Sequence, residues 1–128
     1  MLVADTHAWL WWTAGDAKLS DRARAAMEGV DEIGVCTHSL LEIAWLVRSG
    51  RLELQPEVLS WLKQAIGGPG VTLLPLTPEV AVTASRLTEL VGRDPADCVI
   101  TATAMLRAVP LVTRDASIRN ARVVETIW

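Results

Sequence analysis

The chain begins MLVADTHAWLWW, residues 1–12, and this stretch sets the pattern for the whole sequence. The apolar run over residues 1–4 predicts a short strand that Asp5 ends, and residues 6–13 then predict a helix that Gly15 stops. A carboxylate therefore stands where a buried strand gives way to a helix. The same arrangement, a strand followed by an acidic residue and a helix or turn, returns further along the chain.

The rest of the sequence alternates predicted strands with predicted helices. Apolar runs predict three further strands and an edge strand, at residues 32–36, 71–76, 111–113 and 123–127. Capping signals, among them Thr77-Pro78 and Asp94-Pro95, and breakers predict helices at residues 21–28, 37–47, 56–66, 78–90 and 95–107, with a brief turn at 115–118. This alternation predicts one domain over residues 1–128. Its fold class is α/β, a central and mainly parallel sheet flanked by helices on both faces.

Four acidic residues follow predicted strands or open predicted helices: Asp5, Glu42, Asp97 and Asp115. Because the carboxyl ends of parallel strands form one crevice, residues far apart in sequence can meet there. Carboxylates gathered in one crevice repel each other, and the pKa of some of them rises unless a cation holds them together. Ligands that are all oxygen suit Mg²⁺ or Mn²⁺, which also leave room for phosphate oxygens. The sequence therefore predicts a divalent metal site and phosphodiester chemistry.

Each of these acids also has a purely structural interpretation. Asp5 can cap the helix that it precedes, and Asp115 can form a turn. Glu42 can lie on the solvated face of its helix, and Asp97 can stabilise the helix dipole. Asp94, three residues before Asp97, is the natural N-cap of the helix over 95–107. Their common location, rather than any one of them, carries the functional interpretation.

Composition narrows the classes of function. The 128 residues carry a formal net charge of −3, which argues against a broadly basic surface for nucleic acid. Mean hydropathy is +0.30, yet no apolar stretch approaches the roughly 20 residues that cross a bilayer, and no secretory signal is visible. We therefore expect a cytoplasmic protein without a membrane partner. Cys36 and Cys98 fall in a predicted strand and a predicted helix, where core thiols are expected.

Several segments, in order along the chain, resemble PIN-domain proteins of the VapC toxin type. The resemblance is carried by VADTHAWLW (3–11), SLLEIA (39–44) continuing to GRL (50–52), RDPAD (93–97) with ITATA (100–104), and LVTRD (111–115). It extends from the first residues to Trp128. Many relatives with the Asp-Pro-x-Asp segment carry His where Gly92 stands and Arg where Cys98 stands.

The resemblance implies a PIN-like three-layer α/β/α sandwich and a Mg²⁺-dependent endoribonuclease, the toxin of a type II toxin-antitoxin system. It implies that the Mg²⁺ ligands and catalytic residues are Asp5, Glu42, Asp97 and Asp115, of which Asp5 and Asp97 are the most direct ligands. It also implies three partners: an RNA substrate, a homodimer partner, and a cognate antitoxin whose C-terminal segment lies near the active site in a higher-order complex.

Other side chains have weaker assignments. The Thr113 hydroxyl can hydrogen-bond a water near the acids, although a β-branched residue closing a strand is the commoner explanation. Arg93 and Arg114 are candidates for contact with the RNA backbone, because guanidinium groups suit phosphate oxygens. His7 and His38 form no close ligand pair and are interpreted as structural. Of the six tryptophans, some are expected at partner interfaces and the rest in the core.

Two alternatives to the nuclease remain at this stage. A receiver-like, phosphoryl-binding signalling domain would also place acids at the carboxyl ends of its strands. It needs a lysine at the end of a late strand, and the only lysines, Lys18 and Lys63, are misplaced for that role. A catalytically silent PIN binding module would keep the fold for partner contact alone. The presence of all four acids disfavours it.

Overall fold

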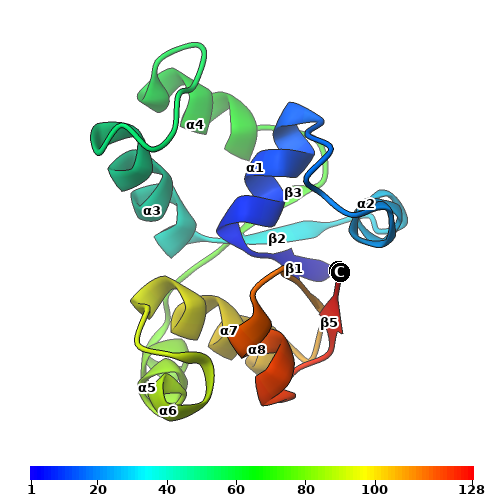
Figure 1. Ribbon diagram of the computed structural model, residues 1–128, viewed down its shortest axis with the longest axis vertical. Coiled ribbons are helices and arrows are strands. Elements are labelled where there is room, and N and C mark those ends of the chain that lie inside the picture. The colour runs from blue at the N-terminus through cyan, green and yellow to red at the C-terminus, as the bar shows by residue number, and fades with distance from the viewer.

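Five parallel strands form one sheet in the computed structural model, which describes residues 1–128. The strands are β1 (Leu2–Ala4), β2 (Ile33–Cys36), β3 (Val71–Leu74), β4 (Leu111–Val112) and β5 (Thr126–Ile127). Their order across the sheet is β3-β2-β1-β4-β5, so β1 lies at the centre (Figure 1). Val3 pairs with Gly34 on one side and with Leu111 on the other. The sheet that the sequence predicts to be mainly parallel is parallel throughout.

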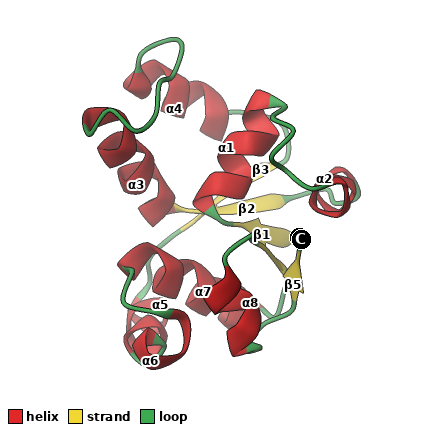
Figure 2. Cartoon of the chain, in the orientation of Figure 1, coloured by secondary structure: helices red, strands yellow, loops and turns green.

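Helices cover both faces of this sheet and make three layers (Figure 2). One layer contains α1 (Thr6–Ala14), α2 (Asp21–Glu28), α3 (Thr37–Arg48) and α4 (Val58–Ile66). The other contains α5 (Pro78–Ser85), α6 (Thr88–Val91), α7 (Pro95–Arg107) and α8 (Ala116–Ala121). The α/β/α sandwich predicted from the sequence is confirmed. No helix combines the length and apolar character that a membrane span requires.

Successive side chains of the central strand divide between the two cores. Leu2 and Ala4 pack with the α1–α4 layer, whereas Val3 packs with the α5–α8 layer, because strand side chains alternate between faces. Trp9 is 1% exposed and meets Trp61 of α4 edge-on at 5.7 Å between ring centroids. Apolar burial on both faces stabilises the sheet between the two helix layers.

The helix predicted over residues 78–90 is wrong as a single element. It forms α5 and α6, separated at Arg86 and Leu87, and the backbone N–H of Arg86 bonds to the carbonyl of Thr83 as α5 closes. Leu87 and Val91 are both buried in the α5–α8 core, at 4% and 2% exposure. Their spacing of four residues places both on one helix face, as it would in an unbroken helix.

Other boundaries differ from the sequence prediction in smaller ways. The turn predicted at residues 115–118 is the start of α8, because Asp115 caps it and Ile118 is fully buried. Glu57, rather than Pro56, precedes α4, and its carboxylate accepts hydrogen bonds from the N–H groups of Leu59 and Ser60. The strands predicted at 71–76 and 123–127 are shorter. Cys36 and Cys98 are free, buried thiols, as predicted.

Candidate active site

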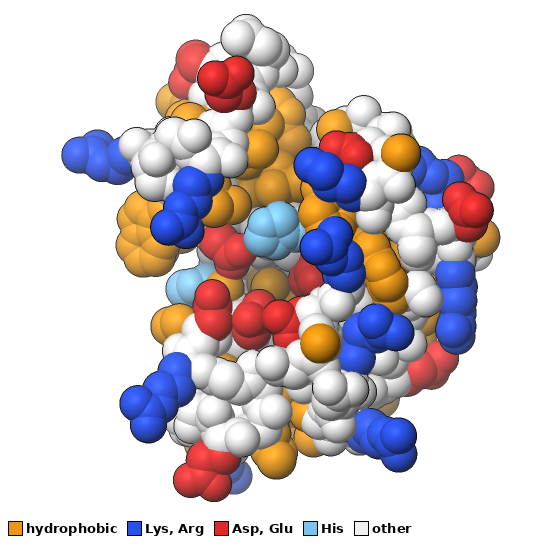
Figure 3. All heavy atoms as spheres, viewed as in Figure 1, with side chains coloured by type: hydrophobic (Ala, Val, Ile, Leu, Met, Phe, Trp, Pro, Cys, Tyr) orange, Lys and Arg blue, Asp and Glu red, His pale blue; other side chains and the backbone are white.

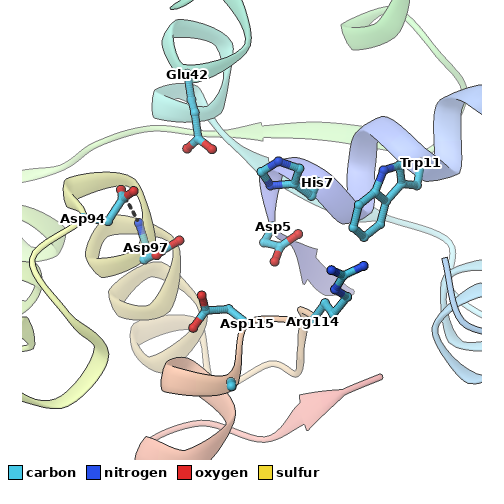
Figure 4. Close-up of a pocket in the computed structure, with 9 residues that line it drawn as sticks. Asp5, His7, Trp11, Glu42, Asp94, Asp97, Arg114 and Asp115 are labelled. Carbon is cyan, nitrogen blue, oxygen red and sulfur yellow. Dashed lines mark hydrogen bonds between the residues drawn. The ribbon is translucent and has the colours of Figure 1, made fainter. Parts of the chain in front are cut away.

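A cavity of about 560 Å³ opens at the carboxyl edge of the sheet, between α1 and α3 on one side and α7 and α8 on the other (Figures 3 and 4). It collects all four acids predicted from the sequence together with a fifth. Its lining residues are Asp5, His7, Trp11, Glu42, Asp94, Asp97, Arg114, Asp115 and Ala116. In Figure 4 the Glu42 carboxylate projects from α3 toward Asp97 and Asp115 on the opposite side.

Three of these carboxylates also cap helices. Asp5 Oδ1 accepts the backbone N–H of Ala8 at 2.7 Å as the N-cap of α1. Asp115 Oδ1 accepts that of Ile118 at 2.9 Å as the N-cap of α8. Asp94, predicted as the N-cap of α7, occupies that position and lines the cavity as well. The structural and functional interpretations are therefore compatible, because the helix starts direct these acids toward the same space.

Burial raises the pKa of several of these carboxyl groups. Asp5 is 9% exposed, and its pKa is raised by loss of solvation, against the opposing effect of hydrogen bonds from Thr113 and from the Ala8 N–H. The pKa of Glu42 is raised by burial and then by the charge of Asp94. Burial, followed by the charges of Asp94, Asp115, Glu42 and Asp5, raises the pKa of Asp97 to about 7. The cavity therefore concentrates negative charge at a cost to the folded protein.

No lysine or arginine pairs with these carboxylates, and the charge of His7, which lowers the pKa of Asp5 and Glu42, is outweighed by their burial. The one ion pair in the structure joins Lys18 to Asp16 at 4.0 Å, away from the cavity. Arg114 lines the cavity, but its guanidinium lies over the ring of Trp11 and forms no ion pair with the acids. Carboxylates crowded together without an ion-pair partner raise the free energy of the folded state, so the donor set fits a cation supplied from outside.

The acids do not form a closed cage. No three of the side chains that could ligate a metal converge closely enough to hold an ion by themselves. Such an open arrangement fits Mg²⁺, which takes one or two protein carboxylates and keeps several waters. It does not fit a structural zinc site, which needs four converging nitrogen or sulfur ligands.

The raised pKa of Asp97 predicts an unusual dependence of stability on pH without metal. The folded protein keeps this proton up to about pH 7, whereas the unfolded chain loses it near the ordinary pKa of 3.8. The folded state therefore binds more protons across this window, and the stability falls as the pH rises through it. For a half-buried group we expect a loss of about 1 kcal/mol, or a few degrees of melting temperature, after allowance for solvent screening.

The measurement is thermal unfolding in EDTA at several pH values between 4 and 8. Asp97→Asn removes the titrating group and should flatten the profile. Saturating Mg²⁺ should also flatten it, because the cation competes with the proton. A wild-type protein that is more stable at pH 8 than at pH 5 in EDTA would contradict the prediction.

Three polar or aromatic residues of the cavity were not predicted from the sequence as site residues. Asp94 was assigned only a cap, although its spacing of three from Asp97 places both on one face of α7. His7, interpreted as structural, is solvent-exposed and lines the cavity. Trp11 lies one turn beyond His7, so the i, i+4 spacing of these two residues on one helix face was the available signal. His38 lines a neighbouring groove with Trp45 and Asp94.

The structure also gives the positions of Thr113, Arg93 and Arg114, the residues with weaker assignments from the sequence. Thr113 is fully buried at the end of β4, and its hydroxyl accepts the N–H of Asp115 at 3.0 Å. It thus positions two of the acids, Asp5 and Asp115, rather than facing open solvent. Arg93 is exposed in the segment before α7 and does not line the cavity, whereas Arg114 does.

The fold and this cavity can be compared with known proteins. The PIN domain family matches residues 2–124, which shows the class of protein. The chain is 40% identical over 121 residues to ribonuclease VapC22 of Mycobacterium tuberculosis (strain ATCC 25618 / H37Rv), a match that covers 94% of this chain and 92% of that protein. The chain therefore belongs to the VapC ribonuclease family of PIN-domain proteins, as its sequence motifs predict.

Solved structures share the fold at low sequence identity. A toxin-antitoxin complex from Klebsiella pneumoniae contains a chain with a TM-score of 0.70 and 16% identity, covering 97% of this chain and 95% of that one. VapBC2 from Rickettsia felis, bound to a DNA fragment from its promoter, contains one with a TM-score of 0.69 and 15% identity, covering 98% and 96%. These similarities support the fold assignment alone.

Proposed function

We propose that this chain is a Mg²⁺-dependent endoribonuclease that acts as the toxin of a type II toxin-antitoxin system. The observation that carries the proposal is a cavity lined by five carboxylates that form no ion pair with any side chain of the protein, in a member of the VapC ribonuclease family. A polyanionic substrate would be repelled by this cavity without a bound cation. Metal-assisted hydrolysis of an RNA phosphodiester is the reaction class that uses such a site.

The acids of the cavity would have different roles in binding the metal ion. Asp5 and Asp97 would hold the ion directly, with Glu42 and Asp115 as further ligands or as holders of its waters. When bound, a divalent cation acidifies a water molecule and offsets the charge of the phosphate oxygens. Mn²⁺ has similar ligand preferences and is the expected substitute.

Glu42 is best placed to handle a proton. Its carboxylate is partly buried, and the raised pKa makes it a stronger base near neutral pH. The Thr6 hydroxyl lies 3.3 Å from Glu42 Oε2 and fixes the orientation of that oxygen. The carboxylate would take the proton of the attacking water as the water oxygen bonds to phosphorus. The opposite P–O bond breaks in line, and the departing oxygen takes a proton from solvent to become a hydroxyl. Thr113 contributes by holding Asp5 and Asp115 in place.

The two alternative functions gain nothing from the structure. A receiver-like domain needs a lysine beside the acids, and neither Lys18 nor Lys63 lines the cavity. A silent binding module would have no reason to keep several carboxylates at raised pKa in one cavity, at a cost in stability.

Chelation tests the proposed function. We expect EDTA to abolish RNA cleavage by the purified protein, with more than about a hundredfold loss of rate, because the carboxylates then repel the substrate and no ion activates the water. Added Mg²⁺ or Mn²⁺ should restore cleavage, and Ca²⁺ should support it poorly because of its looser geometry. The measurement is cleavage of a labelled single-stranded RNA. Full activity in chelator would contradict the metal mechanism.

The partners proposed for this chain follow from its family and its surface. A cognate antitoxin is expected to bind near the cavity, and a homodimer and higher-order complexes with antitoxin are expected in the cell. Leu41 and Trp45 lie one turn apart on α3 and are 44% and 60% exposed, so they present apolar surface on one face of that helix. They support a protein interface on α3. The cytoplasmic location also stays a prediction.

A further inference from the structure

Arg114 is the only lysine or arginine that lines the acidic cavity, and it makes no ion pair there. Its neighbour in sequence is Asp115, and Asp5 lies on the adjacent strand end (Figure 4). A guanidinium beside several carboxylates would ordinarily pair with one of them, often bidentately. The guanidinium carbon of Arg114 lies instead over the ring of Trp11, 5.5 Å from its centroid.

Trp11 is held in place from two sides. The ring of His7, one turn earlier on α1, lies 5.6 Å away at 48°, and the ring of Trp128 lies 5.8 Å away at 56°. The indole is therefore only partly exposed, yet it still forms part of the cavity wall. Apart from Ala116 it is the only hydrophobic side chain there. A fixed aromatic ring at that point gives Arg114 an alternative to the acids.

Contact with the Trp11 ring can compete energetically with an ion pair between Arg114 and a carboxylate. A cation–π contact at a partly exposed site and an exposed ion pair have similar strengths. A fixed ring loses no rotamer freedom when it takes the guanidinium. Each carboxylate that Arg114 leaves unpaired stays available to an incoming cation, because a guanidinium and a metal ion compete for the same oxygens.

We propose that Trp11 is a positioning residue that holds the Arg114 guanidinium off the carboxylates and presents it to an RNA phosphate next to the scissile one. This inference rests on the proposed ribonuclease function. The cavity is strongly acidic and the chain has a net charge of −3, so the RNA backbone needs a cationic contact besides the metal. Figure 3 shows lysine and arginine side chains beside the acidic hollow rather than within it.

RNA affinity provides the first test. The probe is a short fluorescent single-stranded RNA, titrated in Ca²⁺ so that turnover is slow. We expect Arg114→Gln to raise the Kd about tenfold and to lower the salt slope by about 0.7, the value for one lost phosphate contact on a single strand. Trp11→Leu keeps an apolar side chain against Trp128 but removes the aromatic face, and should raise the Kd about fivefold.

Matched variants control for charge and for packing. Arg119→Gln removes an exposed arginine from α8 that does not line the cavity, and its effect on the Kd should stay below about twofold. Trp11→Phe retains an aromatic face and should keep most of the affinity. Equal changes in the RNA Kd for Arg119→Gln and Arg114→Gln would mean that Arg114 acts only through its contribution to the net charge, and would overturn the proposal.

Metal affinity provides a second, independent test. The probe is Mn²⁺ alone, with free ion measured by its paramagnetic resonance signal and no RNA present. In Trp11→Leu the guanidinium is released to pair with the carboxylates, so Mn²⁺ affinity should fall about fivefold. In the double variant Trp11→Leu/Arg114→Gln the competing cation is gone, and Mn²⁺ affinity should return to the wild-type value or exceed it. A merely structural role for Trp11 predicts the same loss in both variants.

The outcomes separate this inference from the proposed function. If the wild-type protein cleaves RNA with Mg²⁺ but Trp11→Leu binds RNA and Mn²⁺ like the wild type, the positioning role is wrong and the nuclease stands. If the wild type fails to cleave but the variants show the expected changes in RNA and Mn²⁺ binding, the nuclease proposal fails, while the positioning of Arg114 by Trp11 for an RNA phosphate stands. A wild type that binds no RNA overturns the inference outright.

Discussion

Asp97→Asn is expected to lower the rate of RNA cleavage by at least about a hundredfold while raising the melting temperature of the metal-free protein. The activity falls because the amide is a poor ligand for a divalent cation and carries no charge to balance it. The stability rises because Asp97 is surrounded by the charges of Asp94, Asp115, Glu42 and Asp5, which raise its pKa to about 7. Neutral pH forces that group to ionise at an energetic cost, and asparagine removes the cost.

A matched control uses an acid in the same kind of helical position. Asp21 lies in the first turn of α2, as Asp97 does in α7, but away from the cavity. Asp21→Asn should leave cleavage unchanged and lower the melting temperature slightly, because a charge that favours the helix dipole is lost. The measurements are cleavage rate with Mg²⁺ and thermal unfolding in EDTA. A stability loss in Asp97→Asn would mean that Asp97 serves the helix rather than the cavity.

The fold was predictable where a signal is local. Apolar runs ended by acids locate β1 and β4, and capping residues such as Thr77 and Asp94 locate the starts of α5 and α7. The break at Arg86 and Leu87 was not predictable in this way. Arg86 and Leu87 are both good helix formers, so no breaker in the sequence marks the point where α5 ends.

The candidate site was also predictable in part, namely where a general rule of the fold places its residues. The four predicted acids line one cavity because parallel strands end at one edge, which is a general rule of the fold. The contributions of His7, Trp11 and Asp94 were not predicted. Each has an ordinary structural interpretation in the sequence. The packing of α1 against α3 and Trp128 shows which way His7 and Trp11 face, and the packing of α7 beside α3 brings the Asp94 cap to the same cavity.

Two substitutions of Asp5 separate its role as a helix N-cap from its negative charge. Both should abolish RNA cleavage. Its carboxylate accepts the Ala8 N–H at 2.7 Å in a buried setting, with a pKa raised by burial. Asp5→Asn keeps an oxygen for the cap and removes the charge. Asp5→Ala removes both. We expect each to lose at least about a hundredfold in cleavage rate, because the ion loses a direct ligand.

The melting temperatures of Asp5→Asn and Asp5→Ala in EDTA should differ. Asp5→Asn should melt at or above the wild-type temperature, because the buried charge is gone and the cap remains. Asp5→Ala should melt below Asp5→Asn by an amount that corresponds to about 1–2 kcal/mol, the usual cost of a lost N-cap. If Asp5→Asn instead melts clearly below the wild type, the Asp5 carboxylate is needed for folding, and the hydrogen bond from Thr113 is the contact that requires its charge. Equal stability of the two variants would show that the cap contributes nothing and that Asp5 is present for the cation alone.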